Sequence, residues 1–309
     1  MSAARRVIIV GARGSLLSVT QATQVIRSLR RSFPGYAFEL KTITTLGDRV
    51  KDWGRDAKGI FVKEIEDELL AGTIDLAVHS MKDLPSELAP GLILGAAAKR
   101  KDPRDAIIST DGRELMALKK GARVGTTSLR RAAQILRLRP DVRIEGLRGN
   151  LDTRIRKLNE GLYDAIIVAR AGLQRLNIRA ARFKVIPVNI LLPACGQGVL
   201  AIEIRKNDRL MARLCGRLND PRALACVGAE REFLRATGGG CRLPVAVYAK
   251  LRGKKLVLSA LIISKDGARS AAVSGSSTVA GAAALARALA REALDSGGRK
   301  ILAEIDDEE

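Results

Sequence analysis

The sequence predicts an α/β protein with two related α/β domains and a small C-terminal domain of the α+β type. Three observations lead to this fold class. Buried-strand patterns alternate with helical patterns through the first two-thirds of the chain. A unit of helix, Gly-x-x-Asp and buried strand occurs twice, ending first at His79 and again at Ala169. From about Asp220 the pattern changes to consecutive strands, and 309 residues exceed what one ordinary core takes.

The first α/β domain is expected to begin with the buried strand VIIV, which opens into a polar turn. A helix follows and is stopped by Pro34-Gly35, because proline cannot continue a helix. Gly72 is expected to cap the next helix. In order, the expected elements are a strand at 7–10, a helix at about 16–31, a strand at 37–45, a helix at 61–70 and a strand at 74–79.

The second α/β domain repeats this plan. A strand at 122–125 opens into a polar turn and a helix, and later a helix leads through Gly161 and Asp164 into the strand AIIVA. The repetition suggests two related domains that face one another, a form suited to closing on an anionic ligand.

The third domain is expected to combine antiparallel strands with a helix. Tight turns at 252–255 and 265–267 separate the strand patterns, and an alanine-rich helix follows. The acidic tail 305–309 is expected to fray. The expected elements are strands at 245–251, 256–263 and 269–275 and a helix at 280–295.

The charge balance points to an anionic partner. The chain has 54 Lys and Arg against 33 Asp and Glu, a net charge of +21. Nucleic acid, an anionic membrane and an acidic small molecule all fit such an excess, and so does a solvated basic surface without a partner. Aromatic residues make up only 3% of the chain, which disfavours base stacking. No apolar run resembles a membrane span or a signal segment, so we expect a cytoplasmic protein.

Histidine and cysteine usage disfavours metal chemistry. His79 is the sole histidine, and the four cysteines form no C-x-x-C pair, so neither a multi-histidine metal site nor a zinc site is expected. His79 itself is expected to be a packed strand residue. The cysteines are expected to be reduced.

Arginines and hydroxyl residues lie in the predicted turns between a strand and the following helix. Free N–H groups at a helix N-terminus attract carboxylates or phosphates, and an arginine fork grips a carboxylate in two places. Ser or Thr at such a turn is also an ordinary helix N-cap, and that alternative stays open. The first such turn holds Arg13 and Ser15, and the second holds Thr126, Ser128, Arg130 and Arg131.

Further polar residues follow other predicted strands. Arg148, Gly149 and Arg154 form a third cluster, for which a solvated helix face is the alternative. Arg170 and Arg175 follow the strand AIIVA, at the carboxyl end where open α/β sheets bind ligands.

Two more segments are candidates for chemistry. Ser80, Lys82 and Asp83 follow a buried strand and offer a cationic anchor beside a proton donor and acceptor. The run GGGC at 238–241 has two interpretations. It is either a loop that brings Cys241 close to another group or a flexible hinge in which the thiol is incidental.

Seven motifs in order resemble the porphobilinogen deaminase family over nearly the full length of the chain. They are AVHSMKDLP (77–85), KDPRDA (101–106), VGTTSLRR (124–131), LRGNLDTR (147–154), AGLQRL (171–176), LPACGQG (192–198) and GGGCRLP (238–244).

The resemblance implies two α/β domains similar to type II periplasmic binding proteins and a third domain that carries a cofactor cysteine. The corresponding boundaries are residues 1–99 with 197–217, residues 100–196, and residues 218–309. It further implies one covalent dipyrromethane cofactor, held by a thioether to Cys241. The other three cysteines then have no implied role.

The resemblance also implies the reaction. A transferase of tetrapyrrole and heme biosynthesis joins four porphobilinogen molecules head to tail, releases ammonia and yields hydroxymethylbilane. Asp83 falls on the family's catalytic aspartate. The implied partner is this small-molecule substrate, without nucleic acid or membrane, and the protein is expected to be a monomer. Implied to bind cofactor or substrate are Arg13, Ser15, Lys58, Phe61, Ser80, Lys82, Thr126, Ser128, Arg130, Arg131, Arg148, Gly149, Arg154, Arg175 and Gln197.

The chain departs from the family pattern near Lys58, where Asp56-Ala57 stands in place of a usual Gly-Gly pair and the loop is about three residues shorter. Two other classes of protein share single features. A solute-binding protein would have the two-domain arrangement and the arginines but not the GGGC run. A nucleic-acid binder would explain the charge but should show a basic stripe with aromatic residues.

Overall fold

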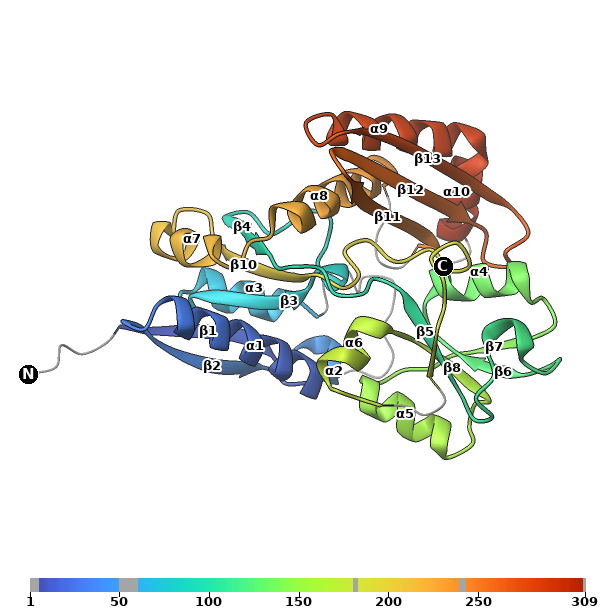
Figure 1. Ribbon diagram of the computed structural model, residues 1–309, viewed down its shortest axis with the longest axis horizontal. Helices are drawn as coiled ribbons and strands as arrows, with labels where there is room; N and C mark the ends of the chain where they lie inside the picture. The colour runs from blue at the N-terminus through green and yellow to red at the C-terminus, as the bar shows by residue number, and fades with distance from the viewer. Residues whose placement is uncertain (1–5, 50–60, 180–182, 239–242, 308–309) are drawn as a thin grey trace, which may run out of the picture. The chain divides into compact units, whose positions relative to one another are not determined.

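The computed structural model describes residues 6–49, 61–179, 183–238 and 243–307. Contacts divide the chain into two compact units (Figure 1). Unit 1 comprises Met1–Arg100 and Val199–Leu224, and unit 2 comprises Lys101–Gly198 and Ala225–Glu309. The boundaries of three domains therefore stay a prediction, since residues from the expected second and third domains share unit 2.

Unit 1 is built on a five-stranded sheet in the order β2-β1-β3-β10-β4. Strand β1 runs parallel to its two neighbours, β2 and β3, whereas β10 runs antiparallel to both β3 and β4. The strands are β1 (Val7–Arg13), β2 (Ala37–Ile43), β3 (Leu76–Ser80), β4 (Leu92–Ala97) and β10 (Leu200–Arg205).

Helices cover both faces of this sheet. Alternate residues of β1 point to opposite faces, so Ile8 and Val10 pack with Leu29 of α1 while Ile9 packs against the cluster that contains Ile65 of α3. The helical elements of unit 1 are α1 (Leu16–Ser32), α2 (Leu46–Arg49), α3 (Lys63–Leu70), the 3₁₀ turn η1 (Met81–Asp83) and α7 (Arg209–Gly216).

Unit 2 contains a second five-stranded sheet in the order β7-β6-β8-β5-β9. Its strands β6, β7 and β8 are parallel, and β5 runs antiparallel to β8 and β9. Its strands are β5 (Asp105–Ser109), β6 (Arg123–Gly125), β7 (Arg143–Glu145), β8 (Ala165–Ala169) and β9 (Phe183–Val185); its helical elements are η2 (Leu115–Ala117), α4 (Leu129–Leu138), α5 (Leu151–Asn159) and α6 (Arg170–Arg175).

The two sheets have one topology, and the predicted duplication is confirmed down to single hydrogen bonds. Gly72 and Gly161 end equivalent helices with φ of 76° and 75°, a left-handed conformation that glycine adopts without strain. Three residues later, Asp75 Oδ2 accepts from the Ile9 backbone N–H at 2.7 Å, and Asp164 Oδ2 accepts from the Arg123 backbone N–H at 2.7 Å. The aspartate of the Gly-x-x-Asp unit thus fixes the neighbouring strand in both sheets.

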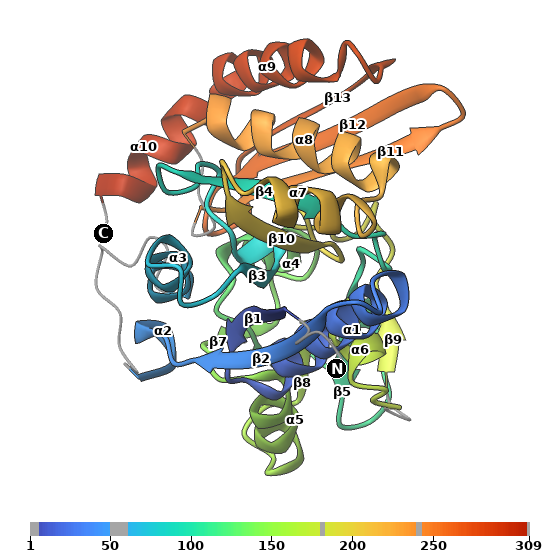
Figure 2. The ribbon, with the colours of Figure 1, turned by 90° about the vertical axis from the view of Figure 1, so that its left-hand side faces the viewer.

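The C-terminal part of unit 2 is a three-stranded antiparallel sheet, β11-β12-β13, with α9 packed along β13 and β12 (Figure 2). Its core includes Phe233, Leu258 and Leu289. The elements are α8 (Pro221–Ala236), β11 (Val245–Arg252), β12 (Lys255–Ile263), β13 (Ser270–Thr278), α9 (Ala282–Ala293), the π-helical turn η3 (Leu294–Gly298) and α10 (Arg299–Asp307).

The predicted fold class, two α/β domains and a small α+β part, is confirmed by these three sheets. One local expectation was wrong: the tail does not fray from residue 305. Helix α10 runs to Asp307, because Ile301 and Ile305 lie one turn apart and both pack into the C-terminal core. Across the described ranges, no helix combines the length and apolarity that crossing a bilayer requires.

Candidate active site

The predicted site residues of unit 1 gather at one edge of its sheet. Arg13 ends β1 and Ser80 ends β3, and the turn η1 with Lys82 and Asp83 follows directly. Because β1 and β3 are parallel neighbours, their carboxyl ends lie at the same edge. This is the edge at which open α/β sheets bind ligands.

Arg13 and Ser15 are held by different contacts. Ser15 is the N-cap of α1, and its Oγ accepts from the Ser18 backbone N–H at 3.3 Å, so the N-cap alternative describes its packing here. The guanidinium carbon of Arg13 lies 4.0 Å from the centre of the Phe61 ring, within cation–π range. Phe61 thus stands beside the first predicted carboxylate-binding residue.

The Lys82-Asp83 turn is anchored from both sides. Met81 and Leu84 are buried, whereas Asp83 is exposed and Lys82 half-buried. Ser80 is tied to helix α1 by the buried Gln21, whose Nε2 lies 3.0 Å from Ser80 Oγ. The apolar anchors therefore hold the backbone of η1 in place and leave the Asp83 carboxylate in solvent.

Three ionisable side chains lie close together on β3, β10 and α3, and this cluster was not predicted from the sequence. His79 Nε2 is 3.0 Å from Oε2 of the fully buried Glu203 on β10, so His79 is the packed strand residue that was predicted, with a carboxyl group beside it. Burial and the neighbouring Glu203 raise the pKa of Glu66 on α3. Within the described ranges, no three His, Cys, Asp or Glu residues are grouped to hold a metal ion.

Replacing Glu66 with Gln is expected to stabilise the protein more at pH 8 than at pH 5. A raised pKa means that the fold favours the protonated carboxyl, so its contribution is complete below the ordinary pKa of 4.5 and is lost as pH rises through the folded-state pKa. The glutamine side chain does not titrate, so the variant lacks this pH-dependent loss of stability. Thermal melts should therefore show a gap between variant and wild type that grows with pH to about 2 °C.

Asp67→Asn is the control for this comparison, since Asp67 lies on the same helix but is exposed. Its melting curve should follow the wild type at both pH values. Equal gaps at pH 5 and pH 8 for Glu66→Gln would contradict the raised pKa of Glu66.

In unit 2, Arg130 and Arg131 share one buried carboxylate. Arg130 Nη2 donates to Asp105 Oδ2 at 2.8 Å, and Arg131 Nη2 donates to Asp105 Oδ1 at 2.6 Å. Burial opposes ionisation of Asp105, but the two guanidinium groups outweigh it and hold the pKa of this carboxyl far below its usual range. Burial also lowers the pKa of Arg130. The trio carries one net positive charge in a buried position, and sequence reasoning missed Asp105 as its centre.

Arg175 and Gln197 each keep a buried polar atom without a hydrogen-bond partner among the described residues. Arg175 is buried on α6, its Nη2 donates to the Gly198 carbonyl at 2.8 Å, and its Nε is the unpaired atom. Burial lowers the pKa of Arg175 to about 10. Gln197 Nε2 donates to Asp105 Oδ1 at 3.0 Å, and its Oε1 is unpaired.

The remaining predicted residues of unit 2 shape two turns. Buried Thr126 accepts through Oγ1 from the Ser128 backbone N–H at 3.2 Å, whereas Ser128 makes no side-chain cap bond to α4. Gly149 has φ of 112°, and Arg154 Nε donates to its carbonyl at 2.7 Å. Arg148 is exposed next to it. Lys58 and Cys241 lie outside the described residues.

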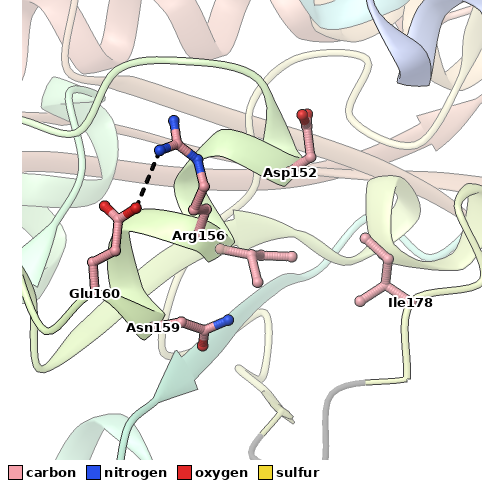
Figure 3. A pocket seen from close by; sticks show the side chains of 6 residues that line it. Asp152, Arg156, Asn159, Glu160 and Ile178 are labelled. Carbon is pink, nitrogen blue, oxygen red and sulfur yellow. Dashed lines mark hydrogen bonds and ion pairs between the residues drawn. The ribbon is translucent and has the colours of Figure 1, made fainter.

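An open hollow of about 510 Å³ lies along α5 (Figure 3). An ion pair of 3.1 Å between Arg156 Nη1 and Glu160 Oε1 crosses its rim. No predicted site residue lines it. Its lining consists of Asp152, Ile155, Arg156, Asn159, Glu160 and Ile178.

Solved structures with a similar fold are distant in sequence. The second substrate-binding domain of a putative amino acid ABC transporter from Streptococcus pneumoniae has a TM-score of 0.44 and 14% identity, covering 69% of this chain and 92% of that one. The periplasmic VFT2 domain of BvgS from Bordetella pertussis has a TM-score of 0.42 and 14% identity, covering 69% and 87%.

Sequence relatives are close and cover nearly the whole chain. Porphobilinogen deaminase of Roseiflexus sp. (strain RS-1) is 46% identical over 302 residues, which are 97% of this chain and 99% of the relative. That of Syntrophobacter fumaroxidans is 46% identical over 303 residues, 97% and 98% of the two chains. That of Brevibacillus brevis is 45% identical over 300 residues, 96% of each.

Two family models match in succession. The model described as "Porphobilinogen deaminase, dipyromethane cofactor binding domain" matches residues 8–213, and "Porphobilinogen deaminase, C-terminal domain" matches residues 224–295. The chain therefore belongs to the porphobilinogen deaminase family, the transferases that polymerise porphobilinogen into hydroxymethylbilane on a dipyrromethane cofactor.

Proposed function

We propose that Asp83 is the catalytic residue of this transferase, that Cys241 holds the dipyrromethane by a thioether, and that the predicted arginines bind the carboxylates of cofactor and substrate. One observation carries the proposal. The predicted residues that follow β1 and β3 in unit 1, and β6, β7 and β8 in unit 2, stand at the carboxyl ends of parallel strands. Those ends are the ligand-binding edge of an open α/β sheet.

The donors in unit 2 fit a polycarboxylate pyrrole. Porphobilinogen carries an acetate, a propionate and a ring N–H, so its binding groups are anions and one donor. The buried Nε of Arg175 offers an unused N–H donor on a cation, and Gln197 Oε1 offers an unused acceptor. Burying either atom without a hydrogen-bond partner costs free energy. A substrate carboxylate bound to Arg175 Nε and a pyrrole N–H bound to Gln197 Oε1 would remove that cost.

Asp83 is suited to stabilise positive charge. The dipyrromethane, when bound, supplies the free pyrrole α-carbon at which the first porphobilinogen is joined. The exposed Asp83 carboxylate accepts a hydrogen bond from the substrate ring N–H and stabilises the cation that develops as the aminomethyl C–N bond breaks and ammonia leaves. Lys82 in the same turn supplies a cation for a substrate carboxylate.

Each porphobilinogen adds two carboxylates, so the growing chain needs increasing positive charge. We assign this charge to Arg13, Arg148 and Arg154 together with Arg130 and Arg131, with Ser15, Ser80, Thr126, Ser128 and Gly149 shaping the turns. Lys58 and Phe61 complete the proposed set. We assign the positive charge of the site to this polyanion, in a cytoplasmic monomer that acts without nucleic acid or membrane.

Replacing Arg175 with Met is expected to raise KM for porphobilinogen about tenfold to a hundredfold while leaving the melting temperature unchanged or higher. A hydrogen bond to a charged group contributes about 1.5–3 kcal/mol, which sets the loss in binding. The stability should not fall, because the change removes a buried charge that no described carboxylate accompanies. Steady-state kinetics and a thermal melt measure both effects.

Arg179→Met is the matched control, since Arg179 is an exposed arginine shortly after α6. It should change neither KM nor the melting temperature. An unchanged KM for Arg175→Met together with a lower melting temperature would show that Arg175 serves only to hold the Gly198 carbonyl, and the proposed carboxylate site would be wrong.

A further inference from the structure

We infer that Glu230, a buried carboxylate on α8, is a positioning residue that fixes the loop 192–198 and through it the arginines of unit 2. Glu230 is fully buried. Its Oε2 accepts from the Gly196 backbone N–H at 2.7 Å, and its Oε1 accepts from the Ala249 backbone N–H at 2.8 Å. One carboxylate therefore joins the loop to β11, and this inference rests on the proposed function of the arginines.

The backbone of the loop is shaped to meet this carboxylate. Gly196 adopts φ of 68°, a left-handed conformation that residues with a Cβ rarely adopt. A second bond ties the loop to the same strand, from the Val247 backbone N–H to the Pro193 carbonyl at 3.2 Å. Glu230 thus adds a charge-assisted hydrogen bond to a loop already seated on β11.

The same short loop contacts the arginine set at three points. The Leu192 carbonyl accepts from Arg130 Nη1 at 2.6 Å, and the Gly198 carbonyl accepts from Arg175 Nη2 at 2.8 Å. Between them, the Gln197 side chain donates to Asp105, the shared partner of Arg130 and Arg131. A shift of this loop therefore moves the partners of three guanidinium groups at once.

The position of Glu230 in the chain also relates this contact to the proposed cofactor cysteine. Helix α8 leads in sequence to Gly238 and shortly afterwards to Cys241, the proposed attachment residue. Glu230 therefore links the helix that precedes the cofactor cysteine to the loop that orients the carboxylate-binding arginines. Misplacing binding groups by about 1 Å is enough to weaken transition-state and substrate contacts strongly.

Glutamine at position 230 tests this role with little change in size. Its carbonyl oxygen can accept from one backbone N–H, but its NH₂ group would face the other N–H as a second donor. In Glu230→Gln, the amide of Gly196 or of Ala249 should exchange hydrogen faster by at least about tenfold, as measured by hydrogen-exchange mass spectrometry. KM for porphobilinogen should rise about tenfold, with kcat within about threefold of the wild type, in protein whose intact mass shows the cofactor attached.

Glu232→Gln is the matched control on the same helix, since Glu232 pairs with Arg235 and Arg287 and not with the loop. It should leave KM and the exchange of Gly196 unchanged. Glu230→Asp keeps both oxygens and the charge but shortens the side chain, so it covers the case in which Glu230→Gln does not fold. A smaller rise in KM is expected for it.

A normal KM in folded, cofactor-loaded Glu230 variants, with only a lower melting temperature, would overturn the inference and leave Glu230 a structural residue. The result is separable from the proposed function. If Arg175→Met raises KM and the Glu230 variants do not, the carboxylate site stands and the positioning role fails. If Arg175→Met has no effect on KM, the proposed site itself fails.

Discussion

Cys241→Ser is expected to yield a protein whose intact mass equals that of its sequence, whereas the native protein should be heavier by two pyrrole units. Serine lacks the sulfur of the thioether, and its hydroxyl is a much weaker nucleophile than a thiolate, so we expect no equivalent bond to form. Without the attached primer, turnover of porphobilinogen should be abolished. Intact-protein mass spectrometry and ammonia release measure the two effects.

The other thiols are poorly placed to substitute for Cys241. Cys215 is fully buried in the core of unit 1, and burial raises the pKa of its thiol to about 12. Cys226 is buried in the C-terminal core, and Cys195 packs against it. Cys226→Ser should therefore keep the two-pyrrole mass excess. A native protein of unmodified mass, or an excess that survives in Cys241→Ser, would contradict the assignment.

Asp83→Asn is expected to keep the attached cofactor but to lose about 10²- to 10⁴-fold in kcat, the usual contribution of one positioned acid or base. Asparagine retains the size of the side chain but not the negative charge that stabilises a developing cation. The melting temperature should be unchanged, because Asp83 is exposed and the turn is held by Met81 and Leu84. Ammonia release and intact mass report turnover and loading separately.

Glu87→Gln is the control for Asp83→Asn, since Glu87 is an exposed acid a few residues further along the same segment. It should retain wild-type turnover. Near-normal product formation by Asp83→Asn would refute the catalytic role, whatever its melting temperature.

The sequence predicted the strands and the duplication well because both depend on local patterns. Buried strands such as 165–169 are continuous apolar runs, and the Gly-x-x-Asp unit has a fixed backbone role in both sheets. Element ends were less accurate. The first strand was expected to stop at residue 10, yet β1 runs to Arg13 because Gly11, Ala12 and Arg13 continue the parallel pairing with β2.

The site was predicted as a set of positions, but not its internal contacts. Strand ends follow from the alternation of elements, so Arg13, Lys82 and Arg175 could be placed at sheet edges. The pairing of Arg130 and Arg131 with Asp105 could not be predicted, because the residues belong to different elements, α4 and β5, and no sequence spacing relates them. Glu203 and Glu230 were missed for the same reason: an acidic residue in a strand or helix gives no local sign that it is buried.

The strand order of unit 1 has a consequence for how the protein is made. Residues are synthesised from the N-terminus, but β10, which joins β3 to β4, belongs to a segment that emerges only after residues 101–198. Until then, β3 lacks its neighbour on one side and β4 lacks the strand that joins it to the sheet, and an unpaired strand edge invites association with other chains. Four of the five strands are therefore synthesised well before the sheet can close, and we expect the nascent chain to be most prone to association during this interval.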